Sequence, residues 1–275
     1  MTTDVNRRVL PGFSLALGYT LLYMSLLVAI PLGAGFLKAS HLPFSEFWAA
    51  VASERALAAY RLTVGASLAS AVINVVVGVL VAWVLVRYQF PLKGLLDSLV
   101  DLPFALPTAV AGLVYSDLFV EQGWYGRFLV PLGIQGAYSR LGIVLVLVFI
   151  GFPFVVRTLQ PVLEGLDKDV EEAAACLGAN RLQTALRVIF PSILPAVITG
   201  FALAFARSLG EYGSVVFVSG NMPFRTEIAP VLVVARLEEF AYTEATAIAV
   251  VLLTISFVTL FLINLLERWS KRHHG

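Results

Sequence analysis

Two charged residues, Arg207 and Glu211, lie four residues apart inside a long apolar stretch. Charged side chains at such positions are costly and usually face a protein interior or a water-filled cavity. The spacing places both on one face of a helix, so one interpretation is an ion pair that neutralises them. The other is that Arg207 lines or gates a path for an anion, where a fixed positive charge offsets the lost hydration. Both can hold, because a partnered arginine binds an anion weakly enough to release it.

Two prolines, Pro103 and Pro107, interrupt another apolar stretch. Each removes a backbone donor and frees a carbonyl upstream. The result is either a static bend, or a hinge or unwound segment that exposes polar backbone to the same path. Asp97 and Asp101 precede the prolines, where a helix dipole favours carboxylates, and we do not assign them to a substrate. The residues predicted to border a translocation path are therefore Arg207, Glu211, Ser208, Pro103 and Pro107.

The sequence offers little material for catalysis or metal binding. An intramembrane enzyme would need paired carboxylates, an activated nucleophile or metal-spaced histidines within the apolar stretches, which hold only Arg207 and Glu211. Cys176 is the only cysteine, and His41, His273 and His274 fall near expected ends of helices or of the chain. We expect no catalytic residue, no metal site and no cofactor.

The composition points to a membrane protein. Of the 275 residues, 59% are hydrophobic and only 13% are charged, whereas soluble domains carry about 25% charged residues. The 19 Lys and Arg nearly cancel the 18 Asp and Glu, and the net charge of +1 provides no basic field for nucleic acid. We predict an all-α, polytopic protein in contact with membrane lipid, with residues 1–275 forming a single transmembrane domain.

Charge-free runs mark the expected spans, since a helix needs roughly 20 apolar residues to cross the hydrocarbon core. Three such runs lie between Arg8 and Lys38, Arg61 and Arg87, and Glu244 and Glu267. Less uniform spans are expected at about 98–120, 141–163 and 195–218. About six transmembrane helices result, so both termini lie on one side of the membrane.

The positive-inside rule identifies that side as the cytoplasm. The face that holds the termini would carry Arg7, Arg8, Arg87, Lys93, Arg157, Lys168, Arg181, Arg187, Arg268, Lys271 and Arg272. The opposite face would carry the smaller set Lys38, Arg55, Arg61, Arg127, Arg140, Arg225 and Arg236. We therefore expect a multi-pass protein of the bacterial cytoplasmic (inner) membrane with cytoplasmic N- and C-termini.

The longest cytoplasmic segment, residues 164–194, is predicted to be a helical hairpin. Asp169 and Glu172 fit a capping box at a helix start, and three alanines, 173–175, propagate that helix at minimal entropic cost. Gly178 is expected to end it in a left-handed conformation. A second helical stretch follows, and Pro191 precedes the return to the membrane.

Within this hairpin, Glu172-Ala173-Ala174, Gly178 after three residues and Val188-Ile189-Phe190-Pro191 after nine more resemble the EAA loop of binding-protein-dependent ABC importer permeases. Val188 and Phe190 stand where the family usually has Ile and Leu, both apolar changes. The resemblance implies the MetI-like fold of type I ABC importer permeases. It also implies that Glu172, Ala173, Ala174, Gly178 and Pro191 couple the chain to an ATPase.

Three further segments narrow the resemblance. The Pro-rich run 101–112 is similar to the third helix of sulfate and molybdate permeases. The runs 208–217 and 226–230 are similar to sulfate and thiosulfate permeases of the CysT (CysU) type, in which Tyr212 and Ser214 stand where molybdate members tend to have Phe and Ala. The resemblance, from about Leu15 to Leu266, implies import of sulfate or thiosulfate, with molybdate or tungstate as the alternative.

The same resemblance implies the partners. Two copies of an ABC ATPase would bind the cytoplasmic loops, a second related permease would pair with this chain, and an extracytoplasmic sulfate-binding protein would deliver the anion. Nothing in the sequence resembles the phosphate-cradling GxxxxGK[ST] loop, so ATP hydrolysis is expected on the partner and this subunit is expected to be non-catalytic. A passive channel is disfavoured by the hairpin.

Small residues recur at helix-facing spacing in two of the spans, as close helix packing in lipid requires. Either internal packing or a seam with a second subunit explains them. The two sets are Gly65, Ala69 and Ser70, and Gly200, Ala204 and Ser208.

Overall fold

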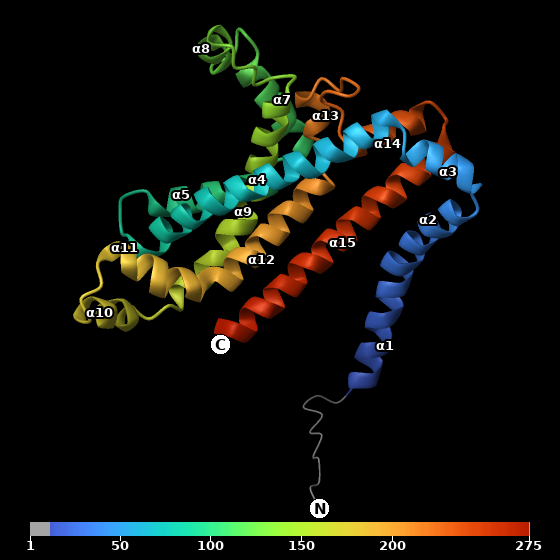
Figure 1. The fold of residues 1–275 in the computed structure, drawn as a ribbon. Helices are drawn as coiled ribbons and strands as arrows, with labels where there is room; N and C mark the ends of the chain where they lie inside the picture. Colours follow the sequence, from blue (N-terminus) through green and yellow to red (C-terminus); the bar gives the residue numbers. More distant parts are fainter. Residues whose placement is uncertain (1–11, 275) are drawn as a thin grey trace, which may run out of the picture.

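The computed structural model describes residues 12–274, and within that range all regular structure is helical (Figure 1). Arg7 and Arg8 lie outside the described residues, as do the side chains of Lys168 and of residues 268–274, including His273 and His274. Five helices are long and apolar enough to cross a membrane. They correspond to five of the six expected spans and cover Phe13–Ser40, Glu54–Arg87, Arg140–Glu164, Arg181–Leu209 and Tyr242–Glu267.

The first span joins α1 (Phe13–Met24), the π-helical turn η1 (Ser25–Ala29) and α2 (Ile30–Ser40). Its first part, α1, stands apart from the rest of the molecule (Figure 1), and its last part, α2, contacts α15 (Tyr242–His274). None of the residues in the most apolar window of this span is buried. A helix that is apolar all round and uncovered by its own chain needs lipid or another protein around it. The short α3 (Phe44–Val51) connects it to the body.

Three long helices, α4 (Glu54–Arg87), α9 (Arg140–Glu164) and α12 (Phe190–Leu209), pack together as the core. Val155 of α9 is fully buried at their meeting point. A Cβ on Gly78 would lie 2.7 Å from Val155 Cγ1, and one on Gly200 would lie 3.2 Å from Val155 Cα. The absence of a side chain at both glycines therefore lets α4 and α12 approach α9 closely.

The two sets of small residues have different roles. Gly200, Ala204 and Ser208 are buried within this core. By contrast, Gly65 and Ala69 are exposed, and a Cβ on Gly65 would meet nothing within 4 Å. The first set serves internal packing. In the second set only Gly65 and Ala69 face away from the chain's own helices, because Ser70 is buried against α12.

The third expected span is divided into α5 (Lys93–Val100), α6 (Leu102–Ala105) and α7 (Thr108–Phe119). Pro103 occupies the first turn of α6, where its missing N–H is tolerated. Leu106 is extended, with ψ of 132°, because a residue before proline is pushed out of the helical region, and Pro107 is also non-helical, with ψ of 133°. The chain is unwound at Pro107, so the static-bend interpretation is wrong there. We take α6 and α7 as this crossing.

The fifth span is shifted relative to the prediction of 195–218. The helical run begins at Arg181 with α11 (Arg181–Thr184) and the π-helical turn η3 (Ala185–Ile189), and α12 ends at Leu209. The hydrophobic run continues beyond that point, but Gly210 and Gly213 interrupt the helix. The short α13 (Val215–Val218) follows the turn as a separate element.

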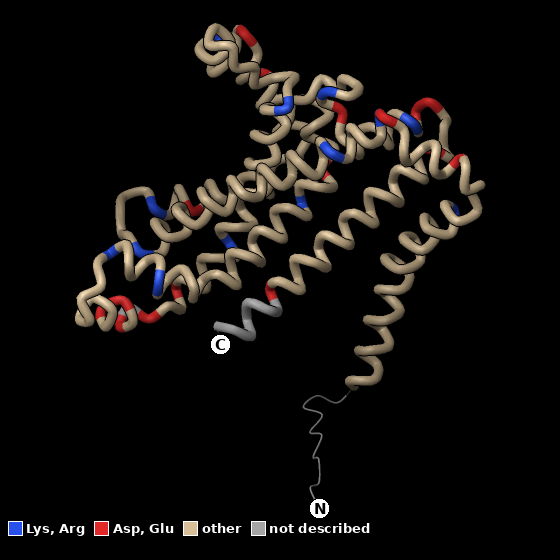
Figure 2. Tube along the Cα trace, in the orientation of Figure 1, with Lys and Arg blue, Asp and Glu red and all other residues tan. Residues whose placement is uncertain are grey.

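The remaining helices lie at opposite ends of the long ones (Figure 1). The hairpin helix α10 (Lys168–Cys176) and α11 lie toward the same lower side as the start of α1 and the end of α15 (Tyr242–His274). At the upper side lie α8 (Gly126–Leu129), the 3-10 turn η2 (Val130–Leu132) and α14 (Ala229–Glu238). Charged residues gather toward these two ends, and few lie between (Figure 2).

Candidate functional site

The predicted ion pair between Arg207 and Glu211 is confirmed. Arg207 Nη1 lies 2.5 Å from Glu211 Oε2. Glu211 is just past the end of α12, and its buried carboxylate also accepts hydrogen bonds at Oε1 from the Ser214 N–H (2.9 Å) and the Ser214 hydroxyl (3.0 Å). The Arg207 side chain keeps 33% of its surface exposed, against 3% for Glu211. The carboxylate is therefore enclosed and holds three hydrogen bonds, and the guanidinium is the more exposed part of the pair.

The unwound segment at Pro107 lies beside this pair. A Cβ on Gly213 would be 2.4 Å from Thr108 Oγ1, and one on Gly112 would be 2.2 Å from the Ser214 carbonyl oxygen. Ser116 Oγ donates a 2.8 Å hydrogen bond to the Phe217 carbonyl. Two helix breaks that are far apart in the sequence thus meet, with α7 packed along α13 (Figure 1).

The side chains of two other predicted path residues pack against neighbouring helices. Ser208 is 2% exposed, and its hydroxyl lies 3.2 Å from that of Ser70 in the α4–α12 interface. Pro103 belongs to α6, which packs against α9 through an edge-to-face contact between Phe104 and Phe154 at 5.2 Å. Ser208 nevertheless stays next to the ion pair, because its carbonyl accepts a 3.2 Å hydrogen bond from the Glu211 N–H. The segment after Pro107 lies against Gly213 and Ser214, and Pro103 lies against α9.

Asp97 and Asp101, which we expected only to face a helix dipole, instead bind Arg157 of α9. The Arg157 guanidinium reaches Asp97 at 2.7 Å and Asp101 at 2.6 Å. The Gln160 amide donates to Asp97 at 2.9 Å. This hydrogen bond and the nearby Arg157 lower the pKa of the Asp97 carboxyl. The network fastens α5 and the start of α6 to α9, so it holds the broken span in position.

A second ion pair was missed by the sequence reasoning. Arg55 of α4 binds Glu227 through two hydrogen bonds of 2.7 Å each, and the Glu227 side chain is 3% exposed. Close by, the Ala229 N–H donates to Thr63 Oγ1 at 2.8 Å. The segment 226–230, noted in the sequence only as a family-like motif, is thereby held against α4.

The hairpin forms, but its first cap differs from the prediction. Asp167 caps α10 by accepting the Asp169 N–H at 3.2 Å. Because the helix begins at Lys168, Asp169 already lies in its first turn, and the predicted box of Asp169 and Glu172 is wrong. A capping box opens α11 instead, where Asn180 and Gln183 exchange two hydrogen bonds of 2.9 Å.

Gly178 ends α10 as predicted, with a φ of +83°. Its N–H donates to the Ala175 carbonyl at 2.9 Å, and the Ala179 N–H donates to the Ala174 carbonyl at 3.0 Å. These two bonds form a Schellman motif, in which the residue after the helix adopts the left-handed conformation. The turn that reverses the chain therefore depends on glycine at this position.

The hairpin presents an apolar outer surface. Leu177, Leu182 and Leu186 are 90%, 67% and 59% exposed. Of the predicted coupling residues, Glu172, Ala173 and Gly178 are exposed, Pro191 is half-buried in the first turn of α12, and Ala174 is turned inward.

The base of the hairpin is tied to α4. Arg87 Nη2 lies 2.7 Å from Glu171 Oε1 and donates to the Leu166 carbonyl at 3.1 Å. Glu171, and not the neighbouring Glu172, makes this anchor. A movement of the hairpin would therefore be transmitted to the end of a core helix.

Similarity to known proteins extends over almost the whole chain. It is 50% identical over 254 residues to the "Sulfate transport system permease protein CysT" of Synechocystis sp., covering 92% of this chain and 89% of that one. It is 47% and 45% identical over 271 residues to the proteins of the same name from Salmonella typhimurium and Escherichia coli, covering 98% of each chain.

Solved structures share the fold. A chain of the bacterial ABC transporter involved in the import of the acidic polysaccharide alginate superposes with a TM-score of 0.75 at 18% identity, covering 93% of this chain and 94% of that chain. A chain of the MetNI methionine ABC transporter superposes with a TM-score of 0.55 at 16% identity, covering 85% and 100%. The predicted MetI-like permease fold is confirmed. Residues 74–272 match the family described as "Binding-protein-dependent transport system inner membrane component", and this multi-pass inner membrane chain belongs to that family.

Proposed function

We propose that this chain is the sulfate-translocating permease subunit of an ATP-driven importer. The observation that supports this most strongly is its 45–50% identity, over nearly the full length, to permeases named for sulfate transport in three bacteria. Those names favour sulfate over the molybdate or tungstate alternative. The chain itself would form the membrane path, and ATP hydrolysis would belong to its partner.

The proposed orientation places the hairpin, the start of α1 and both termini in the cytoplasm. Leu177, Leu182 and Leu186 form an exposed apolar surface beside Ala173 that fits a groove on a partner, and exposed apolar patches of this kind mark interaction sites. We assign that partner as the ATPase, present in two copies. A second related permease and an extracytoplasmic sulfate-binding protein complete the proposed assembly.

The proposed path passes the partly exposed face of Arg207. A dianion that leaves water needs positive charge, but a path must also release it. The bond to Glu211 lowers the net charge of the pair to zero, so Arg207 offers hydrogen-bond donors without a deep electrostatic trap. The unwound backbone at Pro107 adds polar groups near the turn at Gly213 that follows Glu211, which a continuous helix would not expose.

Reconstitution tests the function. The chain should be purified with its ATPase, second permease and binding protein and placed in liposomes. We expect sulfate-loaded binding protein to stimulate ATP hydrolysis and labelled sulfate to accumulate only when ATP is supplied. Thiosulfate should compete for uptake, and molybdate should not. Stimulation by molybdate but not by sulfate, or sulfate flux without ATP, would refute the proposal.

A further inference from the structure

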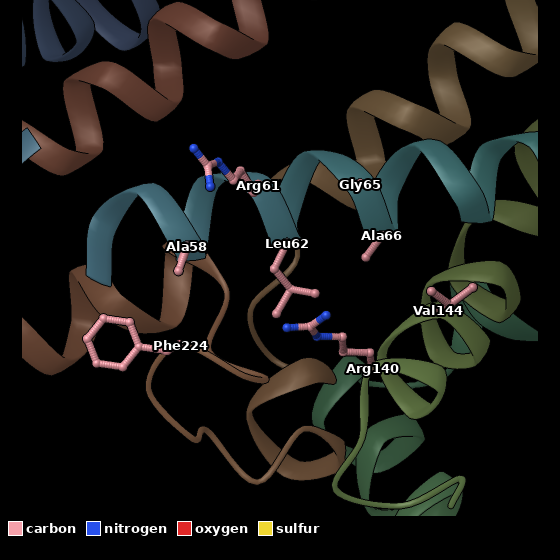
Figure 3. Close-up of a pocket in the computed structure, with 8 residues that line it drawn as sticks. All are labelled: Ala58, Arg61, Leu62, Gly65, Ala66, Arg140, Val144 and Phe224. Carbon is pink, nitrogen blue, oxygen red and sulfur yellow. The ribbon is translucent and has the colours of Figure 1, made fainter. Parts of the chain in front are cut away.

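A cavity of about 490 Å³ lies between the first turns of α4, the start of α9 and the segment around Phe224 (Figure 3). Arg61 and Arg140 border it together with apolar residues that include Leu62, Ala66 and Val144. It lies at the end of α9 opposite the hairpin, which the proposed orientation makes extracytoplasmic. The path residues Arg207 and Glu211 are not among its lining residues.

Arg140 is oriented at this cavity by one hydrogen bond and keeps other donors available for a ligand. Its Nε donates a 2.8 Å hydrogen bond to the Arg225 carbonyl, which fixes the guanidinium from one edge. Among the described residues, no carboxylate pairs with it and no acceptor is bound by its terminal nitrogens. Figure 3 shows the guanidinium pointing across the cavity toward Leu62 of α4. Planar guanidinium groups bind tetrahedral oxyanions through two parallel hydrogen bonds.

Arg61 adds a second positive charge at the rim. In Figure 3 its guanidinium leaves α4 on the side away from Arg140, so it would reach the same ligand only through a rotamer change. It also has no carboxylate partner within the described part of the chain. The other described arginines of α4 and α9 do, since Arg55, Arg87 and Arg157 lie 2.7 Å or less from a carboxylate oxygen. The uncompensated positive charge on the described parts of these two helices is therefore concentrated at the cavity.

We propose that this cavity is an oxyanion-binding site, with Arg140 as its fixed ligand and Arg61 as a second cation that closes on the bound anion. The recognised chemistry is a tetrahedral dianion or monoanion such as sulfate or phosphate. Two sources can supply it: the free transported oxyanion, or the phosphate of a lipid headgroup, whose glycerol would contact Leu62 and Val144. Binding of the free transported oxyanion rests on the proposed function, whereas binding of a lipid phosphate does not.

The test measures binding to the purified permease complex in nanodiscs without the binding protein. In phosphatidylcholine discs, equilibrium binding of labelled sulfate and of inorganic phosphate is compared for wild type, Arg140→Gln, Arg61→Gln and Arg127→Gln. Arg127 is the matched control, because it is an arginine of α8, outside the cavity, that stacks on Phe128. In phosphatidylglycerol discs, native mass spectrometry measures how many lipids each variant retains.

We expect Arg140→Gln to weaken binding of the free anion, or retention of phosphatidylglycerol, by roughly tenfold or more, because it removes a charged hydrogen-bond donor pair. Arg61→Gln should give a smaller loss, and Arg127→Gln none. A loss in the first measurement identifies the free oxyanion as the ligand, and a loss in the second identifies the lipid. If the Arg140→Gln subunit fails to assemble, the same two binding measurements are made on Arg61→Gln and on Arg140→Lys, which keeps the positive charge. These two variants then test the site.

Unchanged binding of anion and lipid in all variants would overturn the site. So would a result in which Arg140→Gln weakens only capture of the binding protein, since that would make Arg140 a protein contact. If wild type binds phosphate at Arg140 but does not import sulfate with its partners, the site stands and the proposed function fails. If the complex imports sulfate but the wild-type permease binds neither anion nor lipid, the proposed function stands and the site fails.

Discussion

At the scale of single residues, the Arg207–Glu211 pair is asymmetric. Its carboxylate is buried and holds three hydrogen bonds, whereas its guanidinium is one-third exposed. Removing the arginine leaves a buried carboxylate with only the Ser214 donors. Removing both leaves no buried charge at all. The two changes should therefore affect stability and transport differently.

Arg207→Ala should destabilise the subunit by roughly 1–3 kcal/mol, reduced from a fully buried pair because Arg207 is partly exposed. Arg207→Ala with Glu211→Ala should recover much of the stability but not the transport. The measurements are the melting temperature in detergent and uptake of labelled sulfate. Arg236→Ala is the control, since the side chains of its partners Glu239 and Glu244 are 49% and 45% exposed, against 3% for Glu211, and little stability should change. Wild-type uptake in both Arg207 variants would remove this charge from the path.

Asp97 gives the protein an acid-sensitive contact. Its pKa is lowered by the Gln160 amide and by Arg157, so its ionised form is favoured in the folded state. The stability it contributes is present above the pKa of an unfolded aspartate, about 4, and is lost as the pH falls through the lowered value. Between pH 6 and pH 3 the melting temperature of wild type should fall more than that of Asp97→Asn. Parallel curves would show that this contact does not contribute.

At the scale of elements, the hairpin depends on one backbone conformation. A Cβ at Gly178 would meet nothing within 4 Å, so the cost of substitution comes from its positive φ and not from crowding. Gly178→Val should cost roughly 1–2 kcal/mol and misorient the turn that presents Leu177. We expect correct membrane insertion but weak co-purification of the ATPase and low sulfate uptake.

Gly178→Asn is the matched control, because asparagine tolerates the left-handed region. It should retain most of the ATPase binding. Normal co-purification and normal uptake in Gly178→Val would remove the coupling role from this turn. Loss of insertion in that variant would instead indicate a folding defect.

Replacing two glycines in different helices by alanine should have opposite effects on the stability of the subunit. At Gly112 of α7 the new methyl would lie 2.2 Å from the Ser214 carbonyl oxygen, whereas at Gly65 of α4 it would enter open space. Gly112→Ala should therefore cost roughly 1–3 kcal/mol by forcing α7 from α13. Gly65→Ala should leave the isolated subunit as stable or up to about 1 kcal/mol more stable. Thermal unfolding of the two variants in detergent measures these changes in stability. Equal changes in melting temperature would contradict the close packing of α7 on α13 at Gly112.

The elements also show which features of the fold can be predicted from the sequence. Charge-free runs located the long helices, and Gly178 located the end of α10, because both signals are local. The end of α12 was misplaced because Val215–Val218 continues the apolar pattern while Gly210 and Gly213 break the geometry. Arg157 with Asp97, and Arg55 with Glu227, could not be paired from the sequence, since these partners are 60 and 172 residues apart and meet only after the core forms.

At the scale of the whole molecule, the proposed orientation can be tested directly. A reporter fused after Lys271 should be cytoplasmic, and one inserted near Gln122, between α7 and α8, should be extracytoplasmic. The described start of α1 and end of α15 lie on the same side as the hairpin (Figure 1), as an even number of crossings requires. Finding both reporters on the same side of the membrane would overturn the six-span topology.

The uncovered first span also bears on how the protein is made. Among the described residues, its tertiary contacts are chiefly those of α2 with α15, which is synthesised after all three core helices. Contacts between the two ends of a chain form late, after the intervening segments exist. During synthesis, Phe13–Ser40 must therefore remain in the bilayer without this contact while the core of α4, α9 and α12 assembles. A chain interrupted before Tyr242 would lack α15, and α2 would then lose its main contact within the chain.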